Sequence, residues 1–260
     1  MILDNVSRRC WHVWRRNLDV GRETWATNVV PPLLEPLFTI LAFGFGLGMY
    51  VRAITFQGRS YDYLTFLAPG MIASAVMFHS MMECMYGSFI RMRYQRTFAA
   101  ILCTPLLIED ILAGELLWGA TKGLFAGTVV LGVSAAFKLV SFPQGLAVIP
   151  VSAAAGVMFA GFGLFFAGVS PYIDSLNVPM FLFVNPMFLF SGTFFPLDAL
   201  PGWARAIAWA LPLTHVSALM RAATLGRLAP SLWPSVVYLL VVGPLMCLLA
   251  VERMGKRLIK

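Results

Sequence analysis

The sequence predicts an all-α membrane protein with six transmembrane helices. Its 260 residues are 59% hydrophobic and 12% charged, with a mean hydropathy of +0.79, whereas about 25% of the residues of a soluble domain are charged. Apolar runs long enough to cross about 30 Å of hydrocarbon occupy residues 29–51, 63–87, 111–140, 146–169, 178–195 and 232–251. We expect one membrane domain covering residues 1–260.

The basic residues predict the orientation of these spans. With both termini inside, twelve of the 19 lysines and arginines fall on the cytoplasmic side, six fall outside and Lys122 lies within a span. This bias follows the positive-inside rule, so the net charge of +7 is explained by topology and we expect no nucleic-acid partner. The four cysteines lack metal-ligand spacing and are expected to be free thiols.

Residues 1–28 predict an amphipathic helix at the membrane interface. Arginines and tryptophans are scattered through this stretch, which is unlike the continuous apolar core of a signal peptide. At 100° per residue, Trp11, Trp14, Leu18 and Trp25 fall within an arc of roughly 60°. The alternative is a plain basic flank with no specific role.

Several ionisable residues fall inside the spans, where they are functional candidates. Glu35 is expected near the cytosolic end of the first span, either hydrated or paired with an arginine of the interface helix. His79 and Glu83 are four residues apart and share a helix face. The open alternatives are that they hydrogen-bond to each other, that they bond to a neighbouring span, or that they line a substrate path. Lys122 lies two turns from Glu115, roughly 10 Å away, and therefore needs another partner or a watery cavity.

Prolines interrupt two of the spans. Pro69 and Gly70 are expected to break the outer part of the second span, and Asn185 with Pro186 the middle of the fifth. Between residues 193 and 230, three further prolines cut an apolar stretch into pieces too short to cross the bilayer, which predicts re-entrant or interfacial helices.

The cytoplasmic loop at residues 91–110 lies between the second and third spans. Its first half is basic, and Phe98, Ile101 and Leu102 form an apolar face on a short helix that would end at Thr104 and Pro105. An apolar face exposed on the basic side of a membrane needs a cover of lipid or protein.

The chain carries no phosphate-binding G-x-x-x-x-G-K-[ST] loop, no H-E-x-x-H and no G-x-S-x-G motif. We therefore expect a transport subunit that is not an enzyme. It would bind no cofactor or metal itself, and ATP and Mg²⁺ would sit on a partner chain.

The chain resembles the permease subunits of type-2 ATP-binding-cassette (ABC) exporters, among them the NodJ permeases that export nodulation factors (lipo-chitooligosaccharides). The resemblance rests on FLAPGM at residues 66–71, RTFAAILCTPL at 96–106, the Gly-Glu pair at 114–115 and NPMFLFSGTFFPLDALPGW at 185–203. It covers nearly the whole chain in order and in the number of spans.

The resemblance implies a homodimer in a bacterial cytoplasmic (inner) membrane, bound to two cytoplasmic ATPase subunits, with the substrate path at the dimer interface. It places re-entrant helices at about Thr193 to Gly226. The coupling helix that docks on the ATPase maps onto Arg93, Tyr94, Gln95, Arg96, Thr97, Phe98, Ile101, Leu102 and Thr104, with Glu115 close by, where its charge would orient the helix or contact the ATPase.

Transport would follow alternating access or gated extrusion of an amphiphilic glycan or glycolipid (lipooligosaccharide-like); the alternatives are a drug or lipid exporter and an ion-coupled secondary transporter. A secondary transporter would favour an internal repeat, which is not visible here. The outer aromatic residues could stack on sugar rings or form an aromatic belt. The candidates for the translocation path or gate are Glu35, His79, Glu83, Lys122, Asn185, Phe194, Phe195 and Trp203.

Overall fold

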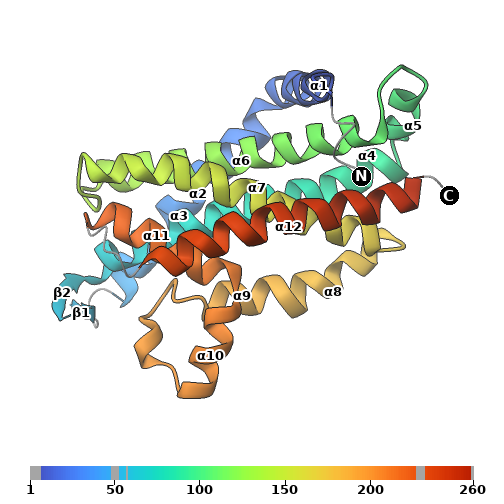
Figure 1. The fold of residues 1–260 in the computed structure, drawn as a ribbon. Coiled ribbons are helices and arrows are strands. Elements are labelled where there is room, and N and C mark those ends of the chain that lie inside the picture. Colours follow the sequence, from blue (N-terminus) through green and yellow to red (C-terminus); the bar gives the residue numbers. More distant parts are fainter. Residues whose placement is uncertain (1–6, 48–52, 57, 227–231, 259–260) are drawn as a thin grey trace.

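A computed structural model describes residues 7–47, 53–56, 58–226 and 232–258. These residues form a bundle of long helices, with a β-hairpin at one end and the short helix α5 at the other (Figure 1). Two of the basic residues expected outside, Arg52 and Arg227, lie outside the described ranges.

The N-terminal part consists of two helices and the hairpin. Helix α1 spans Cys10–Glu23, α2 spans Trp25–Leu41 and continues as the π-helical turn η1, Ala42–Leu47. Strands β1 (Ala53–Phe56) and β2 (Arg59–Asp62) pair antiparallel, with Ala53 opposite Asp62. The fold class is therefore helical as predicted, apart from this hairpin, which lies between the first and second predicted spans.

The second span is one uninterrupted helical path. Helix α3 (Tyr63–Met82) passes through the π-helical turn η2 (Glu83–Gly87) into α4 (Ser88–Arg93). The predicted break at Pro69 and Gly70 is wrong, because α3 continues through both residues. Pro69 has no N–H to donate to the Thr65 carbonyl, and the close packing around the buried Pro69 and Gly70 offsets that loss.

The remaining chain adds four long helical stretches and several short ones. After α5 (Thr97–Leu102) come α6 (Ile108–Ala136), the 3-10 turn η3 (Gln144–Ala147) and α7 (Val148–Val169). The next stretch is η4 (Ile173–Leu176), α8 (Asn177–Pro179), η5 (Met180–Val184) and α9 (Asn185–Phe190). Then follow η6 (Leu197–Ala199), α10 (Gly202–Ala210), α11 (Pro212–Thr224) and α12 (Trp233–Leu258).

Among the described residues, five helical stretches are long and apolar enough to cross a membrane: Tyr63–Arg93, Ile108–Ala136, Gln144–Val169, Ile173–Phe190 and Trp233–Leu258. They match the second to sixth predicted spans. The first predicted span, residues 29–51, is helical as far as Leu47, and its last four residues lie outside the described ranges. Six spans therefore stay a prediction.

The fifth span is not broken at Asn185 and Pro186. The π-helical turn η5 precedes Pro186, which sits in the first turn of α9. Because the helix continues from η5 into α9, the wider π turn is what accommodates the proline and its missing N–H. The predicted break is thus a local widening of a continuous helix.

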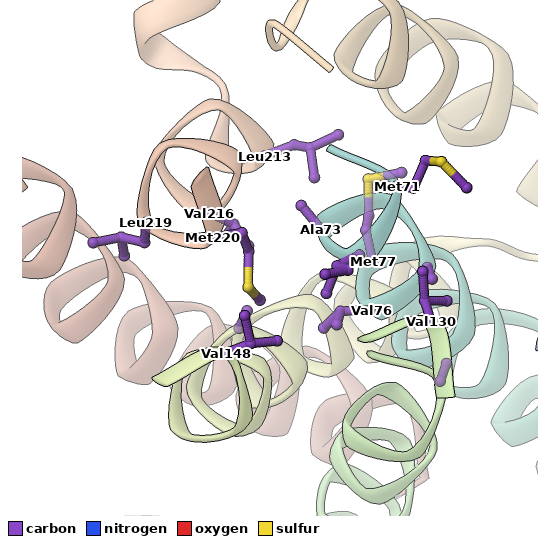
Figure 2. Packing of buried hydrophobic residues seen from close by; sticks show 14 of the residues in the cluster. Met71, Ala73, Val76, Met77, Val130, Val148, Leu213, Val216, Leu219 and Met220 are labelled. Atoms are coloured by element: carbon purple, nitrogen blue, oxygen red, sulfur yellow. The ribbon is translucent and has the colours of Figure 1, made fainter. Parts of the chain in front are cut away.

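Helix α3 forms the centre of the bundle. Met77, Met81 and Met85 are fully buried, so these methionines fill the core and do not face lipid. Figure 2 shows Leu213 and Met220 of α11 gathered with Ala73 of α3 and other apolar side chains of the same cluster. Helix α11 is therefore a core element, whereas α10 projects from the bundle (Figure 1).

Candidate functional site

Four charged side chains meet where the central loop joins the bundle. Arg91 of α4 lies 2.5 Å from Glu115 of α6 and 2.7 Å from Glu83 of η2, measured between nitrogen and oxygen. Lys122 of α6 lies 2.5 Å from the second oxygen of Glu83. We call these four residues the charge cluster.

Helical spacing explains how the charge cluster forms. Glu83 and Arg91 are eight residues apart along one path, Glu115 and Lys122 are seven apart along α6, and both spacings are about two helical turns. Because the two paths run antiparallel (Figure 1), each carboxylate faces a cation of the other helix. Close packing helps: a Cβ on Gly119 would lie 2.4 Å from the Cys84 sulfur.

Neutral donors complete the cluster. Ser88 Oγ donates to Glu115 at 2.5 Å, Asn17 Nδ2 donates to Glu115 at 2.9 Å, and Trp118 Nε1 donates to Glu83 at 2.9 Å. The Glu115 side chain is 0% exposed, and a buried charge is tolerated when it is paired and its remaining lone pairs are satisfied. Asn17 belongs to α1, so the cluster joins the N-terminal helix, the second span and the third span.

The predicted docking loop leaves the bundle directly after Arg91. Arg96 takes a left-handed conformation with φ of 52°, and α5 follows. Phe98 is buried in the core cluster that includes Phe89 and Ile111, so the predicted apolar face is wrong as a single exposed surface. Its covered part belongs to the chain's own core.

The outer side of the loop carries the remaining apolar groups. Tyr94 is 62% exposed and Leu102 is 36% exposed, while Ile101 packs partly against the core. Arg93, Gln95, Arg96 and Thr104 are exposed and Thr97 is half-buried. The surface available to a partner is therefore polar and basic, with an aromatic and an aliphatic side chain on it.

The structure separates two predicted roles of Glu115. A fully buried carboxylate cannot form a surface contact with another protein, and Glu115 instead holds Arg91, two residues before Arg93. Sequence reasoning missed Arg91 as the centre of the site. The sequence signal for it is that Glu83 and Arg91 on one span, and Glu115 and Lys122 on the next, are each about two helical turns apart, so that opposite charges can face each other between antiparallel spans.

The N-terminal helix is attached to α6, so it is more than a basic flank. Val13 and Asn17 are buried, and Trp14 Nε1 donates to Thr121 of α6 at 2.9 Å. Trp11 and Trp25 are exposed. The predicted tryptophan arc is thus divided between a face toward α6 and a face toward the surroundings.

Glu35 lies away from the arginines of α1. It lines a cavity of about 250 Å³ together with Phe43, Met71, Ser74 and Phe194, and Phe194 stacks on Phe43 at 5.6 Å between ring centroids. Within the described residues no ion pair to Glu35 is seen, so the predicted pairing with the interface helix is wrong. The residue sits opposite Met71, eight residues into α3 from the hairpin end.

The other path candidates are distributed over the molecule. Lys122 pairs with Glu83, which agrees with the expectation that it needs a partner other than Glu115. His79 lines a cavity with Trp118 and Lys122, and no hydrogen bond joins it to Glu83 among the described residues. Four candidates line neither that cavity nor the one at Glu35: Glu83, which belongs to the charge cluster, Asn185, Phe195 and the exposed Trp203.

Comparison with known proteins identifies the family. The family model for the ABC-2 type transporter matches residues 8–225. The chain is 34% identical over 215 residues to Nodulation protein J of Sinorhizobium fredii, covering 83% of this chain and 80% of the relative. For Nodulation protein J of Rhizobium meliloti the identity is 35% over 214 residues, covering 82% and 80%.

A more distant relative is the inner membrane transport permease YadH of Escherichia coli, 22% identical over 214 residues and covering 82% of each chain. The matched region includes α1, the charge cluster, the central loop and α11. The chain therefore belongs to the ABC-2 type transporter family of membrane permeases, whose members are transport components.

Proposed function

We propose that this chain is the permease subunit of an ATP-driven exporter that moves an amphiphilic glycan or glycolipid outward across the bacterial cytoplasmic membrane. The proposal takes the working unit as a homodimer with two separate ATPase subunits, and both termini in the cytoplasm. Family membership and the resemblance to nodulation-factor export permeases support it.

The observation that carries the coupling role is the attachment of the central loop. The loop presents Tyr94 and Leu102 outward, while Arg91 ties its beginning to Glu115 of α6 and Phe98 ties α5 to the core. A force applied to α5 by a partner would pass into the second and third spans through these two attachments. Loosely attached, the same helix would move without moving the bundle.

The homodimer proposal is supported by apolar side chains on the fifth span. Phe181 and Leu182 of η5 are 69% and 78% exposed, and large exposed apolar groups are covered by lipid or by protein. In the proposed cycle, ATP binding closes the two ATPases, and the first, second and fifth spans of the two protomers change their separation. Substrate then leaves by alternating access or by gated extrusion.

The test is co-expression of the chain with its candidate ATPase, followed by copurification and measurement of ATP turnover. Tyr94→Ala and Leu102→Asp are expected to weaken copurification and lower ATP turnover. Phe142→Ala is the matched control, because Phe142 is also a large exposed aromatic residue but lies between α6 and α7 at the opposite end of the bundle. If no nucleotide-binding partner associates with the wild-type chain, the exporter proposal fails.

Two alternatives are separated by the same preparation in vesicles. Stimulation of ATP turnover by a lipo-chitooligosaccharide, and not by hydrophobic drugs, supports the glycolipid substrate over the drug exporter. Transport that persists without the ATPase and stops with a protonophore would identify an ion-coupled secondary transporter. Glu35, the one charged residue that lines a cavity of apolar and hydroxyl side chains, is the feature that favours that rival.

A further inference from the structure

We propose that the cleft between the α1–α2 elbow and helices α3, α4 and α6 is a binding site for a phospholipid with an anionic headgroup. This site is separate from the docking loop and from the cavity at Glu35. It does not rest on the export proposal, because any permease embedded in an anionic membrane meets such lipids.

The cleft consists of two adjoining cavities. The first, of about 300 Å³, lies between the elbow, η2, α4 and α6, and the second, of about 270 Å³, lies between the elbow, α3 and α6. Both are lined by Gly21, Thr27, Asn28, Trp118 and Lys122. The shared wall makes them two compartments of one elongated site.

The first compartment is polar and carries a surplus of positive charge. Its lining holds three cations, Arg16, Arg91 and Lys122, and one carboxylate, Glu83. Arg91 and Lys122 are matched by Glu83 and Glu115, which leaves the half-buried Arg16. Within the described residues, the guanidinium of Arg16 donates to one group, the side-chain oxygen of Asn17 at 3.2 Å.

These donors fit a phosphate group. A guanidinium presents its N–H groups in a fork that matches phosphate oxygens. The Lys122 ammonium has three donors, of which one is engaged by Glu83. The side-chain amide of Gln95 lines the same compartment and can donate to phosphate or glycerol oxygens, whereas Asn28 Nδ2 already donates to the Gly21 and Thr24 carbonyls.

The second compartment is mainly apolar. Most of it is lined by hydrophobic and aromatic side chains of the elbow and α6: Leu18, Trp25, Val29, Pro32 and Phe125. Its ionisable lining residues are Arg22, His79 and Lys122. A polar compartment with surplus positive charge that opens into an apolar one matches the two halves of a phospholipid. The proposed lipid comes from the inner leaflet, because the first compartment adjoins the basic end of the second span.

The site can be tested by native mass spectrometry of the full chain in mild detergent. The probes are phosphatidylglycerol and phosphatidylcholine with the same acyl chains. We expect the wild type to retain one phosphatidylglycerol per chain and to bind phosphatidylcholine about tenfold more weakly. Both lipids carry the phosphate, but the choline cation of phosphatidylcholine would be repelled by the surplus positive charge of the compartment.

Two variants target the two compartments. Arg16→Gln removes the surplus cation, and Thr27→Trp fills the junction from an exposed position; each is expected to weaken phosphatidylglycerol retention about tenfold. Arg15→Gln and Ala26→Trp are the matched controls, because both residues are exposed neighbours that line neither compartment. Both controls are expected to retain the lipid.

Several outcomes would overturn the proposal. Equal retention of the two lipids would remove the headgroup preference, and equal losses in Arg15→Gln and Arg16→Gln would indicate general attraction to the basic helix. Displacement of phosphatidylglycerol by added lipo-chitooligosaccharide would identify the cleft as a substrate site and not a phospholipid site. If Arg16→Gln unfolds, Arg16→Lys serves as the test variant in its place. It keeps the charge without the fork and is expected to bind phosphatidylglycerol with a strength between that of the wild type and that expected for loss of the Arg16 charge.

Discussion

Arg91 Nη2 lies 2.5 Å from Glu115 Oε2, which joins the last turn of the second span to the first turns of the third. The Glu115 side chain is fully buried and the Arg91 side chain is 13% exposed. Removing one member of a buried ion pair leaves the other charge uncompensated. The central loop therefore depends on this pair for its attachment to the bundle.

Arg91→Ala is expected to lower the free energy of unfolding by about 3–5 kcal/mol, because Glu115 would stay buried without a cation. Arg91→Lys is expected to cost less, since it keeps the charge and loses the forked contact to both Glu115 oxygens. Denaturant unfolding in mild detergent measures both.

Arg93→Ala is the control for this prediction. Arg93 lies on the same short helix and is exposed, so its removal is expected to change the unfolding free energy by about 0.5 kcal/mol or less. Similar losses for Arg91→Ala and Arg93→Ala would show that the general basicity of the loop matters and the specific pair does not.

The two sides of α5 are expected to respond differently to truncation. Phe98 is 1% exposed, so Phe98→Ala should destabilise the chain by about 3–5 kcal/mol through the cavity it leaves. Leu102→Ala should leave stability within about 0.5 kcal/mol and lower ATPase stimulation if the exposed face docks. If Phe98→Ala lowers ATPase stimulation and Leu102→Ala leaves it unchanged, docking through the exposed face is contradicted.

Hydropathy and charge placement predict most of the fold of this chain. Long apolar runs report spans directly, and the five that lie within described residues agree with the prediction to within a few residues at most ends. The breaks expected at Pro69 and Pro186 fail because the surroundings compensate for the proline: Pro69 is buried in the packed interior of the bundle, and a π-helical turn precedes Pro186. Such compensation depends on neighbours and is invisible in local propensity.

The candidate site could be predicted only in part. Charges at span depth marked Glu83 and Lys122, but their pairing depends on which helices lie side by side. The pairing of Glu35 with an arginine of α1 fails because closeness along the sequence is not closeness in space. Helix α2 begins at Trp25, so Glu35 is ten residues along it, roughly 15 Å from its start.

Replacing a glycine by alanine is expected to destabilise the chain where two helices cross, and to be tolerated where the glycine faces open space. A Cβ on Gly163 of α7 would lie 2.4 Å from the Met81 carbonyl oxygen of α3, whereas a Cβ on Gly132 of α6 would have no atom of another element within 4 Å among the described residues. Gly163→Ala must push two core helices apart and should cost about 1–3 kcal/mol. Gly132→Ala should be neutral or stabilising by up to about 1 kcal/mol.

Thermal unfolding of the two glycine variants measures this difference directly, because both make the same chemical change in a long helix. Equal effects of Gly163→Ala and Gly132→Ala would mean that α3 and α7 are not in the close contact that the structure describes.

The cysteines give a test of loop exposure and docking together. Cys103 follows α5 and is exposed, whereas burial and the negative charge of Asp110 raise the pKa of the Cys10 thiol above its ordinary value. Only the thiolate is nucleophilic, so a raised pKa lowers the reactive fraction at neutral pH and moves the rise of the rate–pH profile to higher pH. With chains that keep a single cysteine, a polar maleimide at pH 7 should modify Cys103 faster than Cys10, and the difference in rate should narrow as the pH rises.

A bound ATPase should slow modification of Cys103, because that residue lies at the end of the proposed docking helix. Cys10 reacting as fast as Cys103 at pH 7 would contradict the burial of Cys10, and unchanged Cys103 labelling in a stable complex would place the ATPase contact elsewhere.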